Sequence, residues 1–293
     1  MKFKQSTSAA YFFLAPAISA IIIFFFIPVI AAFVISFTDF DIYALGDYSS
    51  VRFVGLKNYL QLFDDPLFYT ALQNTFYFVI IAGPLSIAVS LGAALLLNNK
   101  LVKYKAIFRL SYFIPVVTTL VAVAIVWRFI YHPKFGIINY ILSLLGISPV
   151  DWLGEPSTAM PAIILMSVWK SFGYNMIIFI AGLQNISEDL YEAASIEGAS
   201  SWRKFKSITL PMLAPTTVFI SIITMIGFFQ IFAEPYVMTQ GGPLNSTLSI
   251  VQFMYQEGFR WWNMGYSASI AFVLFFIIFI GTLIQFKIQK STE

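Results

Sequence analysis

The feature that most constrains this chain is its series of long apolar runs. The first run extends from Tyr11 to Phe37 and exceeds the roughly 20 apolar residues that a helix needs to cross a bilayer. It is also longer than the apolar core of a cleaved signal peptide, about 7–15 residues, so we expect a retained first span. Charged residues make up only 11% of the 293-residue chain, whereas a soluble domain carries about 25%. The sequence therefore predicts an integral membrane protein.

The apolar runs predict an all-α membrane fold with six transmembrane helices. Their expected ranges are Tyr11–Phe37, Asn74–Leu97, Ile107–Tyr131, Met160–Leu183, Met212–Ala233 and Tyr266–Phe286. We expect residues 1–70 to hold the first transmembrane helix and an external loop. Residues 71–287 are expected to form a core five-helix domain. The largest loop, Thr38 to Gln73, has room for a short strand or helix.

Positive side chains collect on one side of the predicted spans. That side holds Lys2, Lys4, Lys100, Lys103, Lys105, Arg109, Arg203, Lys204, Lys206, Lys287 and Lys290. The other side holds Arg52, Lys57, Lys134 and Arg260. Because Lys and Arg are enriched in cytoplasmic loops, we expect both termini to be cytoplasmic.

The sequence lacks the residues that several kinds of functional site require. Cysteine is absent and His132 is the single histidine, which disfavours a disulfide framework, a thiolate metal site and a histidine metal site. No Gly-Lys pair occurs, so the chain has no phosphate-binding loop of the G-x-x-x-x-G-K-[ST] type. We therefore expect no catalytic residue, metal or cofactor in this chain, and we interpret His132 as an interfacial side chain.

A polar segment separates the fourth and fifth predicted spans. Ser187 is a plausible helix N-cap, with Glu188 and Asp189 in the first turn, where carboxylates suit the helix dipole. Gly198 then provides a C-terminal stop. A second short helix is expected after Ser200 or Ser201, and we expect Pro211 to break it. Such a segment could pack on its own protein or enter a groove on a partner.

The spacing of this segment resembles a family signature. Glu-Ala-Ala, three residues, Gly, nine residues, Ile, one residue and Leu-Pro occur in the membrane subunits of bacterial ATP-binding-cassette (ABC) importers. The matching positions here are Glu192, Ala193, Ala194, Gly198, Ile208, Leu210 and Pro211. The resemblance implies a coupling helix at about residues 187–199 that docks on a separate ATPase subunit. ATP and Mg would then be bound by that partner.

Four further stretches look like carbohydrate permeases of the maltose and glycerol-phosphate type. They are VGLKNYLQLFDDPLFYTALQNT (54–75), WRFIYHPKFGIIN (127–139), WKSFGYNMIIFIAGLQNI (169–186) and TQGGPLNST (239–247). The resemblance implies a type I importer permease in a bacterial or archaeal cytoplasmic membrane. Its implied partners are a second permease, two ATPase subunits and an external solute-binding protein. The motifs do not distinguish one sugar from another.

Polar side chains on two spans are candidates for a substrate path. On the fourth span, five residues share one helical face: Ser167, Lys170, Ser171, Tyr174 and Asn175. On the fifth span, the corresponding residues are Thr217, Ser221 and Thr224. Asn74, Gln230 and Tyr236 are weaker candidates of the same kind. Such stripes also hold helices together. Hydroxyls, amides and aromatics without carboxylates would suit a neutral polyol.

Two ionisable residues fall clearly within the predicted spans. Lys170 lies near mid-depth, where an ionisable group tends to mark function. Pairing with an acid or a carbonyl is the structural alternative to a path-lining role. Arg128 lies near the outer end of its span, and we interpret it as an interfacial side chain whose charge reaches water.

The outer loop after the fifth span contains a Gly-Gly-Pro turn. By family resemblance this loop meets the solute-binding protein, although the same pattern also forms ordinary turns. The candidate contacts are Tyr236, Gly241, Gly242 and Pro243.

The sequence therefore predicts a permease subunit of an ATP-driven, binding-protein-dependent importer of a sugar, oligosaccharide or related polyol. The subunit would form half of the translocation pathway. An ion-coupled secondary transporter of a small polar solute is the alternative. Proton coupling would need carboxylates inside the spans, and the expected span cores contain none; sodium coupling stays open.

Overall fold

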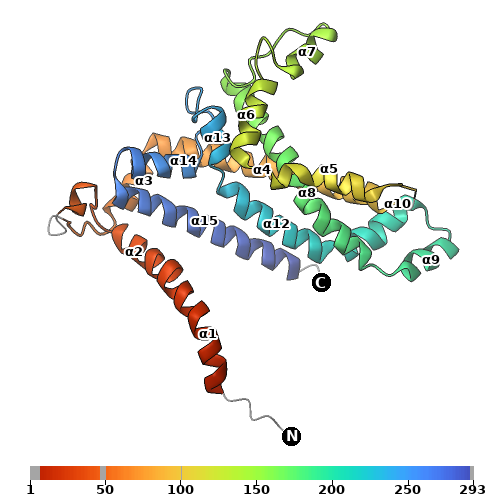
Figure 1. The fold of residues 1–293 in the computed structure, drawn as a ribbon, viewed down its shortest axis with the longest axis horizontal. Coiled ribbons are helices and arrows are strands. Elements are labelled where there is room, and N and C mark those ends of the chain that lie inside the picture. The colour runs from red at the N-terminus through yellow and green to blue at the C-terminus, as the bar shows by residue number, and fades with distance from the viewer. Residues whose placement is uncertain (1–6, 47–50, 100, 291–293) are drawn as a thin grey trace. The chain divides into compact units, whose positions relative to one another are not determined.

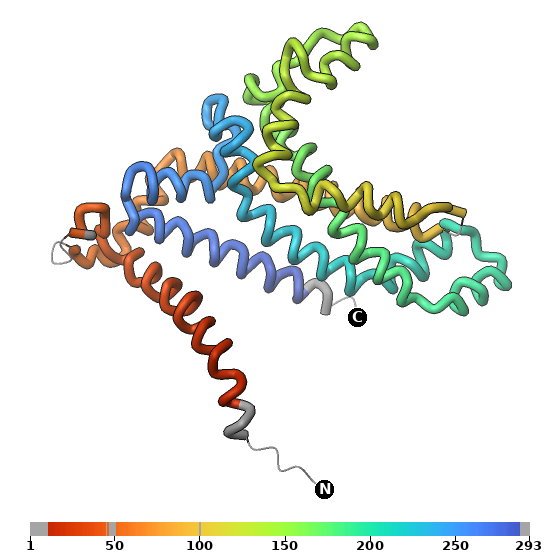
Figure 2. The backbone as a smooth tube through the Cα atoms, viewed as in Figure 1, coloured from red at the N-terminus to blue at the C-terminus, as the bar shows by residue number. Residues whose placement is uncertain are grey.

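The computed structural model describes residues 7–46, 51–99 and 101–290. Lys2, Lys4 and Lys100, which support the expected orientation, lie outside the described residues. The chain divides into two compact units, Met1–Asp65 with Met254–Val273 and Pro66–Phe253 with Leu274–Glu293. Figure 1 shows the ribbon and Figure 2 the backbone trace of these elements. The described residues are helical apart from loops and one isolated bridge between Thr38 and Phe53.

The first unit begins with a long apolar helical run. Its elements are α1 (Thr7–Ile21), η1 (Ile22–Phe26), α2 (Ile27–Ile35), η2 (Tyr43–Leu45), α3 (Lys57–Asp64), η5 (Gln256–Arg260), the end of α14 (Ile250–Tyr255) and the start of α15 (Met264–Lys290). Between Tyr11 and Ile35 the run is long and apolar enough to cross a membrane. Most of its side chains are exposed within this chain, as expected for a surface that contacts lipid.

The second unit contains the remaining helices. They are α4 (Pro66–Asn98), α5 (Lys105–Val117), α6 (Leu120–Ile130), α7 (Ile137–Leu144), α8 (Pro156–Gln184), α9 (Glu188–Ile196), α10 (Ser201–Lys204), η4 (Phe205–Thr209), α11 (Leu210–Met212), α12 (Ala214–Phe229) and α13 (Ala233–Met238). The connecting helices α9 and α10 lie at one end of α8 and α12 in Figure 1, and α13 follows the other end of α12.

The core of the second unit lies between α4, α8 and α12. Small residues allow close helix contacts there, as is common inside membranes. The Ser90 hydroxyl of α4 donates to the Phe172 carbonyl of α8 at 2.9 Å. Gly182 leaves too little room for a Cβ because the Thr216 side chain lies against it. Buried Phe78, Ile163, Met166, Met176, Phe179, Leu213 and Ile220 fill the space between these contacts.

The bounds of the expected spans need correction, and their expected number of six is the upper limit of what the helices allow. Four helices among the described residues are long and apolar enough to cross a membrane, or up to six if each of two bent pairs is one span. The helix of the second expected span, α4, begins at Pro66 instead of Asn74. Its first turns carry the polar residues Thr70, Gln73 and Asn74, which lowered its hydropathy in the sequence without preventing a helix.

The expected third span, Ile107–Tyr131, is not one straight helix. It breaks at Thr118–Thr119, and the axes of α5 and α6 differ by 100°. Four successive β-branched residues, Val116 to Thr119, have restricted χ1 angles and a lower helix propensity. Thr118 and Thr119 are accordingly extended, with ψ near 141° and 135°.

The helix before the fifth span continues past Pro211, which corrects the expected break there. α11 includes Pro211, and the bend of 62° lies between Met212 and Ala214. Pro215 explains this position, because a proline inside a helix lacks an N–H donor and clashes with the carbonyl four residues earlier. α12 therefore starts a new helix with Pro215 in its first turn.

Candidate functional site

The second unit contains a cavity of about 360 Å³ at the α5–α6 break. Elements α8, α12 and α13 form the rest of its wall. It is lined by Val116, Leu120, Ser167, Lys170, Ser171, Tyr174, Asn175, Ile223, Thr224, Gly227, Phe228 and Glu234. Its volume falls within the range of roughly 300–1,000 Å³ that is typical of small-molecule sites.

The structure brings most of the predicted path residues to this cavity. All five members of the α8 stripe and Thr224 of α12 line it. Thr217, Ser221 and Gln230 do not. The Ser221 hydroxyl donates to the Thr217 carbonyl of its own helix at 2.8 Å, and Gln230 is exposed at the end of α12.

A small polar network crosses the helices beside the cavity. The buried Asn175 Nδ2 donates to Thr224 Oγ1 at 3.0 Å and lies 3.5 Å from Ser86 Oγ. Ser86 Oγ is also 3.2 Å from Ser171 Oγ. Ser86 was missed in the sequence, although it forms an i, i+4 polar pair with Ser90 in an otherwise apolar run. These bonds show that the stripe also holds α4, α8 and α12 together.

Two opposite charges line the cavity. Lys170 Nζ donates to the Pro115 and Val116 carbonyls at 3.3 and 3.4 Å, so a carbonyl is the partner of this lysine. Glu234 lies in the wall as well, which corrects the expectation of a lining without carboxylates. It lies just beyond the expected fifth span, Met212–Ala233, and follows the end of α12 by a few residues. Burial raises the pKa of the Glu234 carboxyl, while the charge of Lys170 acts in the opposite direction.

The polar segment forms the expected helix, glycine bend and second helix. The Asp189 N–H donates to Ser187 Oγ at 3.3 Å, and Glu188 and Asp189 occupy the first turn of α9. Gly198 has φ +76°, a conformation that favours glycine. The Ala199 N–H then donates to the Ala194 carbonyl at 2.9 Å. Ser200 caps α10 by accepting from the Arg203 N–H at 3.3 Å.

This segment is held in shape by its own bonds but is not covered by its own chain. Lys204 Nζ donates to Ser195 Oγ at 2.6 Å, and Tyr191 Oη lies 2.9 Å from Thr209 Oγ1. Ile196 is nevertheless 89% exposed and Trp202 is 70% exposed. Large apolar groups exposed on a polar segment are typical of a docking surface.

The signature residues differ in their surroundings. Glu192, Ala193, Leu210 and Pro211 are exposed and Ala194 is half-buried. Ile208 is half-buried against the core between α4, α8 and α12. A cavity of about 400 Å³ beside Glu192 also includes Asn98 and Gln184 at the ends of α4 and α8. The exposed members, with Ile196 and Trp202, define a surface that we call the α9–α10 surface.

The loop between α13 and α14, which the sequence predicts to be an outer loop and which keeps that name below, is anchored by Asn74. Asn74 Nδ2 donates to the Asn245 and Leu248 carbonyls at 2.7 and 3.1 Å, so Asn74 holds this loop and is absent from the cavity lining. Of the predicted contacts, Tyr236 is exposed, Gly242 and Pro243 are half-buried and Gly241 is buried. Leu244, a large apolar residue in the same loop, is 88% exposed.

Arg128 and His132, which we interpreted as interfacial side chains, form hydrogen bonds with backbone groups. Arg128 Nη1 donates to the Val237 carbonyl at 3.4 Å. His132 Nδ1 accepts from the Lys134 and Phe135 N–H groups at 3.2 Å each. His132 therefore closes the turn after α6.

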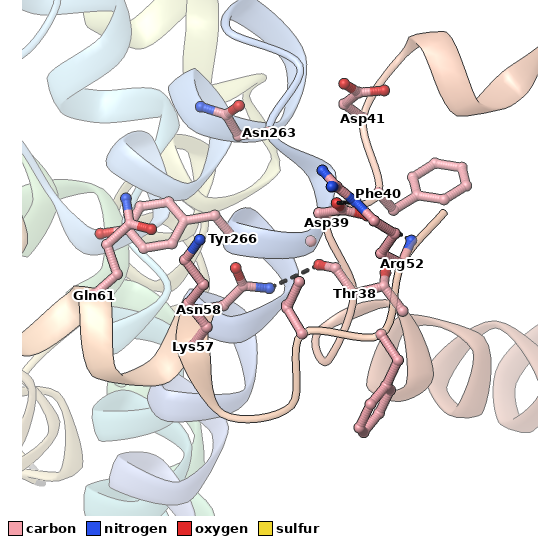
Figure 3. A pocket seen from close by; sticks show the side chains of 13 residues that line it. Thr38, Asp39, Phe40, Asp41, Arg52, Lys57, Asn58, Gln61, Asn263 and Tyr266 are labelled. Carbon is pink, nitrogen blue, oxygen red and sulfur yellow. Dashed lines mark hydrogen bonds and ion pairs between the residues drawn. The ribbon is translucent and has the colours of Figure 1, made fainter. Parts of the chain in front are cut away.

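The first unit has its own polar pocket of about 500 Å³, shown in Figure 3. The Asn58 amide donates to the Thr38 carbonyl at 2.9 Å, and Arg52 Nε to Asp39 Oδ2 at 2.8 Å. The backbone N–H of Arg52, together with its guanidinium, holds the pKa of Asp39 below its usual value. These bonds join the start of the loop after α2 to α3 and fix its conformation.

A family comparison identifies the chain. Residues 86–293 match the sequence model of the family described as the binding-protein-dependent transport system inner membrane component. The chain belongs to this family. The resemblance drawn from Glu192–Pro211 is therefore confirmed, and the matched region contains α8 to α13 and the cavity. The family consists of transport permeases, and an ion-coupled secondary transporter is not favoured.

Individual relatives of the permease cover its length. It is 40% identical over 291 residues to the arabinooligosaccharides transport system permease protein AraP of Bacillus subtilis (strain 168), covering 99% of this chain and 91% of that protein. It is 37% identical to the lactose transport system permease protein LacF of Rhizobium radiobacter, with 97% and 94% covered.

A solved structure supports the fold of the permease. A chain of a bacterial ABC transporter involved in the import of the acidic polysaccharide alginate matches with a TM-score of 0.81 at 22% identity. The match covers 97% of this chain and 95% of that chain. The helical arrangement described above is therefore that of an ABC importer permease.

Proposed function

We propose that the permease forms half of a translocation path for a neutral sugar, oligosaccharide or related polyol. The cavity of about 360 Å³ carries this proposal. Hydroxyl, amide and aromatic groups line it, and these can exchange hydrogen bonds with a saccharide as it sheds water. Lys170 and Glu234 add one basic and one acidic side chain to this lining. Two relatives whose names include an oligosaccharide and a sugar support the substrate class.

The α9–α10 surface is proposed to receive an ATPase subunit. Ile196 on α9 and Trp202 on α10 provide the exposed apolar anchors. Glu192, Ala193 and Ala194 belong to α9, and Gly198 makes the bend that leads to α10. The segment between α10 and α12 contains the remaining signature residues, Ile208, Leu210 and Pro211. ATP and Mg would be bound by the partner, since this sequence has no phosphate-binding loop.

The full transporter is proposed to contain a second permease, two ATPase subunits and an external binding protein. Both termini of this chain would then face the cytoplasm, and the loop containing Tyr236, Gly241, Gly242 and Pro243 would face the binding protein. Closure of the ATPase pair would rotate the permeases and switch the cavity between the two sides of the membrane. This is rigid-body switching biased by nucleotide.

The path assignment is tested by replacing the amide at the centre of the polar network. Asn175→Leu keeps a similar volume but removes the bonds to Thr224 and Ser86. We expect uptake of labelled oligosaccharide by cells with the complete transporter to fall about tenfold or more, because a buried hydroxyl loses its partner. Ser111→Ala is the control, since its hydroxyl bonds only within α5 and lies outside the cavity lining.

The energy source is measured in the same cells. Uptake should persist when the membrane potential is collapsed and ATP is retained. Uptake that stops under those conditions would contradict the ATP-driven mechanism. Normal uptake by the Asn175 variant would remove this cavity from the path.

A further inference from the structure

The break between α5 and α6 leaves polar backbone in the wall of the cavity. α5 ends at Val117 and α6 begins at Leu120, and Val116 and Leu120 both line the cavity. The last carbonyls of any helix have no partner within that helix. Inside a membrane such groups must be satisfied by the protein or by water in a cavity.

Lys170 satisfies two of these carbonyls. Its ammonium donates to Pro115 O and Val116 O from α8. A positive charge is also favourable at this end of α5, because the helix dipole is negative there. Gly173, one turn further along α8, lies against the Tyr112 carbonyl so closely that a Cβ would not fit. α8 therefore contacts the last turns of α5 through both a close backbone approach and a charged bond.

Glu234 is an acidic side chain in the wall of the same cavity. It lines the cavity from α13, and its charge acts on Lys170. Within the described part of the chain, the two side chains form no direct ion pair, and Lys170 is bonded to α5 instead. A lysine side chain is long and flexible, and the cavity wall holds both its observed carbonyl partners on α5 and the Glu234 carboxyl on α13.

We propose that Lys170 is a positioning residue that fixes the α5–α6 break against α8, and that its ammonium transfers to Glu234 when the break moves during transport. The inference rests on the proposed function, because the movement is part of opening the path. Lys170 acts on the cavity through α5, and contact with the solute is not required. In the state described here the ammonium is on the α5 side.

The angle at the break can be measured directly. The chain has no cysteine, so Ile107→Cys with Phe129→Cys places one spin label on α5 and one on α6. Both side chains are exposed, at 61% and 71%. Distances between the labels are recorded on the complete transporter in nanodiscs, with and without ATP and binding protein. We expect a narrow distribution that shifts between the two conditions.

Lys170→Met removes the charged donor while keeping an unbranched side chain. We expect the narrow population to fall about tenfold, because two carbonyls lose a charge-assisted bond. Lys170→Arg should restore it, since a guanidinium also donates to carbonyls. If the methionine variant does not insert, Lys170→Gln retains a neutral donor and should give an intermediate distribution.

Glu234→Gln tests the second half of the proposal, in which the Lys170 ammonium transfers to Glu234. The distribution without ATP should match that of the unchanged chain, because Lys170 is then on α5. The shift with ATP should be lost, and the maximal uptake rate should fall about tenfold with KM unchanged, since the charge acts on a conformational step. A substrate contact would change KM instead.

Three outcomes would overturn the proposal. One is an unaltered distance distribution in Lys170→Met under both conditions. The second is a raised KM with unaltered distances, which would make Lys170 a contact of the solute. The third is a normal ATP-dependent shift in Glu234→Gln. The distances are recorded without solute, so failure of the saccharide assignment would show separately, as absent uptake by the unchanged transporter.

Discussion

At the scale of single residues, backbone conformation explains why a glycine occupies position 198. Gly198 follows α9 with φ +76°, and no atom lies within 4 Å of where a Cβ would be. A Cβ would therefore meet no neighbour, and the restriction at this position comes from the backbone conformation. Such a restriction is felt most at a glycine that joins two short helices, because it fixes the angle between them.

A graded series at Gly198 tests this restriction. Gly198→Asn should be mild, because Asn tolerates the left-handed region. Gly198→Ala should cost about 1 kcal/mol locally, and Gly198→Pro more, because proline is fixed near φ −65°. We expect membrane insertion to be retained while uptake falls in the order Asn, Ala, Pro. Uptake per inserted molecule, measured against the amount in the membrane fraction, checks this order. Equal uptake by the Ala and Pro variants would contradict it.

The residues found from the sequence and those missed differ in a physical way. Ser167, Lys170, Ser171, Tyr174 and Asn175 were found because one helix presents them at a regular spacing. The partner of Lys170 could not be found, since a carbonyl carries no sequence signal. Glu234 could not be placed in the cavity because it lies beyond α12, and only the fold brings α13 back beside the α5–α6 break.

At the scale of elements, one buried amide organises the loop around α7. Asn139 is 4% exposed. Its Nδ2 donates to the Pro133 and Val150 carbonyls at 3.2 and 2.8 Å. Its Oδ1 accepts from the Val150 N–H and Trp152 Nε1 at 3.1 Å each. The segment between α6 and α8 thus closes on a single side chain.

Replacing this amide should loosen the segment without affecting the helix bundle. Asn139→Leu leaves several buried polar groups unpaired, each worth about 1–3 kcal/mol. We expect faster proteolysis within residues 133–152 and a lower thermal midpoint of the purified permease. Ser143→Ala is the control, because its exposed hydroxyl bonds only to Tyr140 O on α7 itself. Proteolysis at the same rate in both variants would show that Asn139 does not organise the loop.

The elements also show which helix boundaries can be predicted. Ser187 and Gly198 marked α9 correctly because caps are local signals. Prolines were less informative. Pro115 lies inside α5, and the break comes at the β-branched pair Thr118–Thr119. Pro211 likewise lies inside a helix, and Pro215 marks the bend. A proline that occupies a first helical turn favours the helix it begins.

At the scale of the whole molecule, both ends of the second unit expose large apolar side chains. Ile196 and Trp202 lie on the α9–α10 surface, and Leu244 lies on the outer loop. The fold class was predictable because long apolar runs dominate the chain. The partners of these surfaces were implied by the family resemblance, since one chain carries no direct sign of another.

The two exposed surfaces should have separable functions. Ile196→Ser with Trp202→Ala should weaken co-purification of the ATPase subunit about tenfold or more, because buried aromatic anchors dominate interfaces. Leu244→Ser is the matched control, since it removes a similarly exposed apolar group from the opposite end. We expect it to leave the ATPase bound. Equal loss of ATPase in both variants would indicate general misfolding and contradict the assignment.

The continuity of α8 has a mechanical consequence. The same helix carries Lys170 and ends at Gln184, only a few residues before α9. At 1.5 Å per residue, the distance along α8 from Gln184 to Lys170 is about 21 Å. A tilt of α8 by roughly 10° about Gln184 would therefore move Lys170 sideways by ~4 Å. A small tilt of α8 at the end that leads to α9 is therefore enough to move the Lys170 ammonium by more than the length of a hydrogen bond.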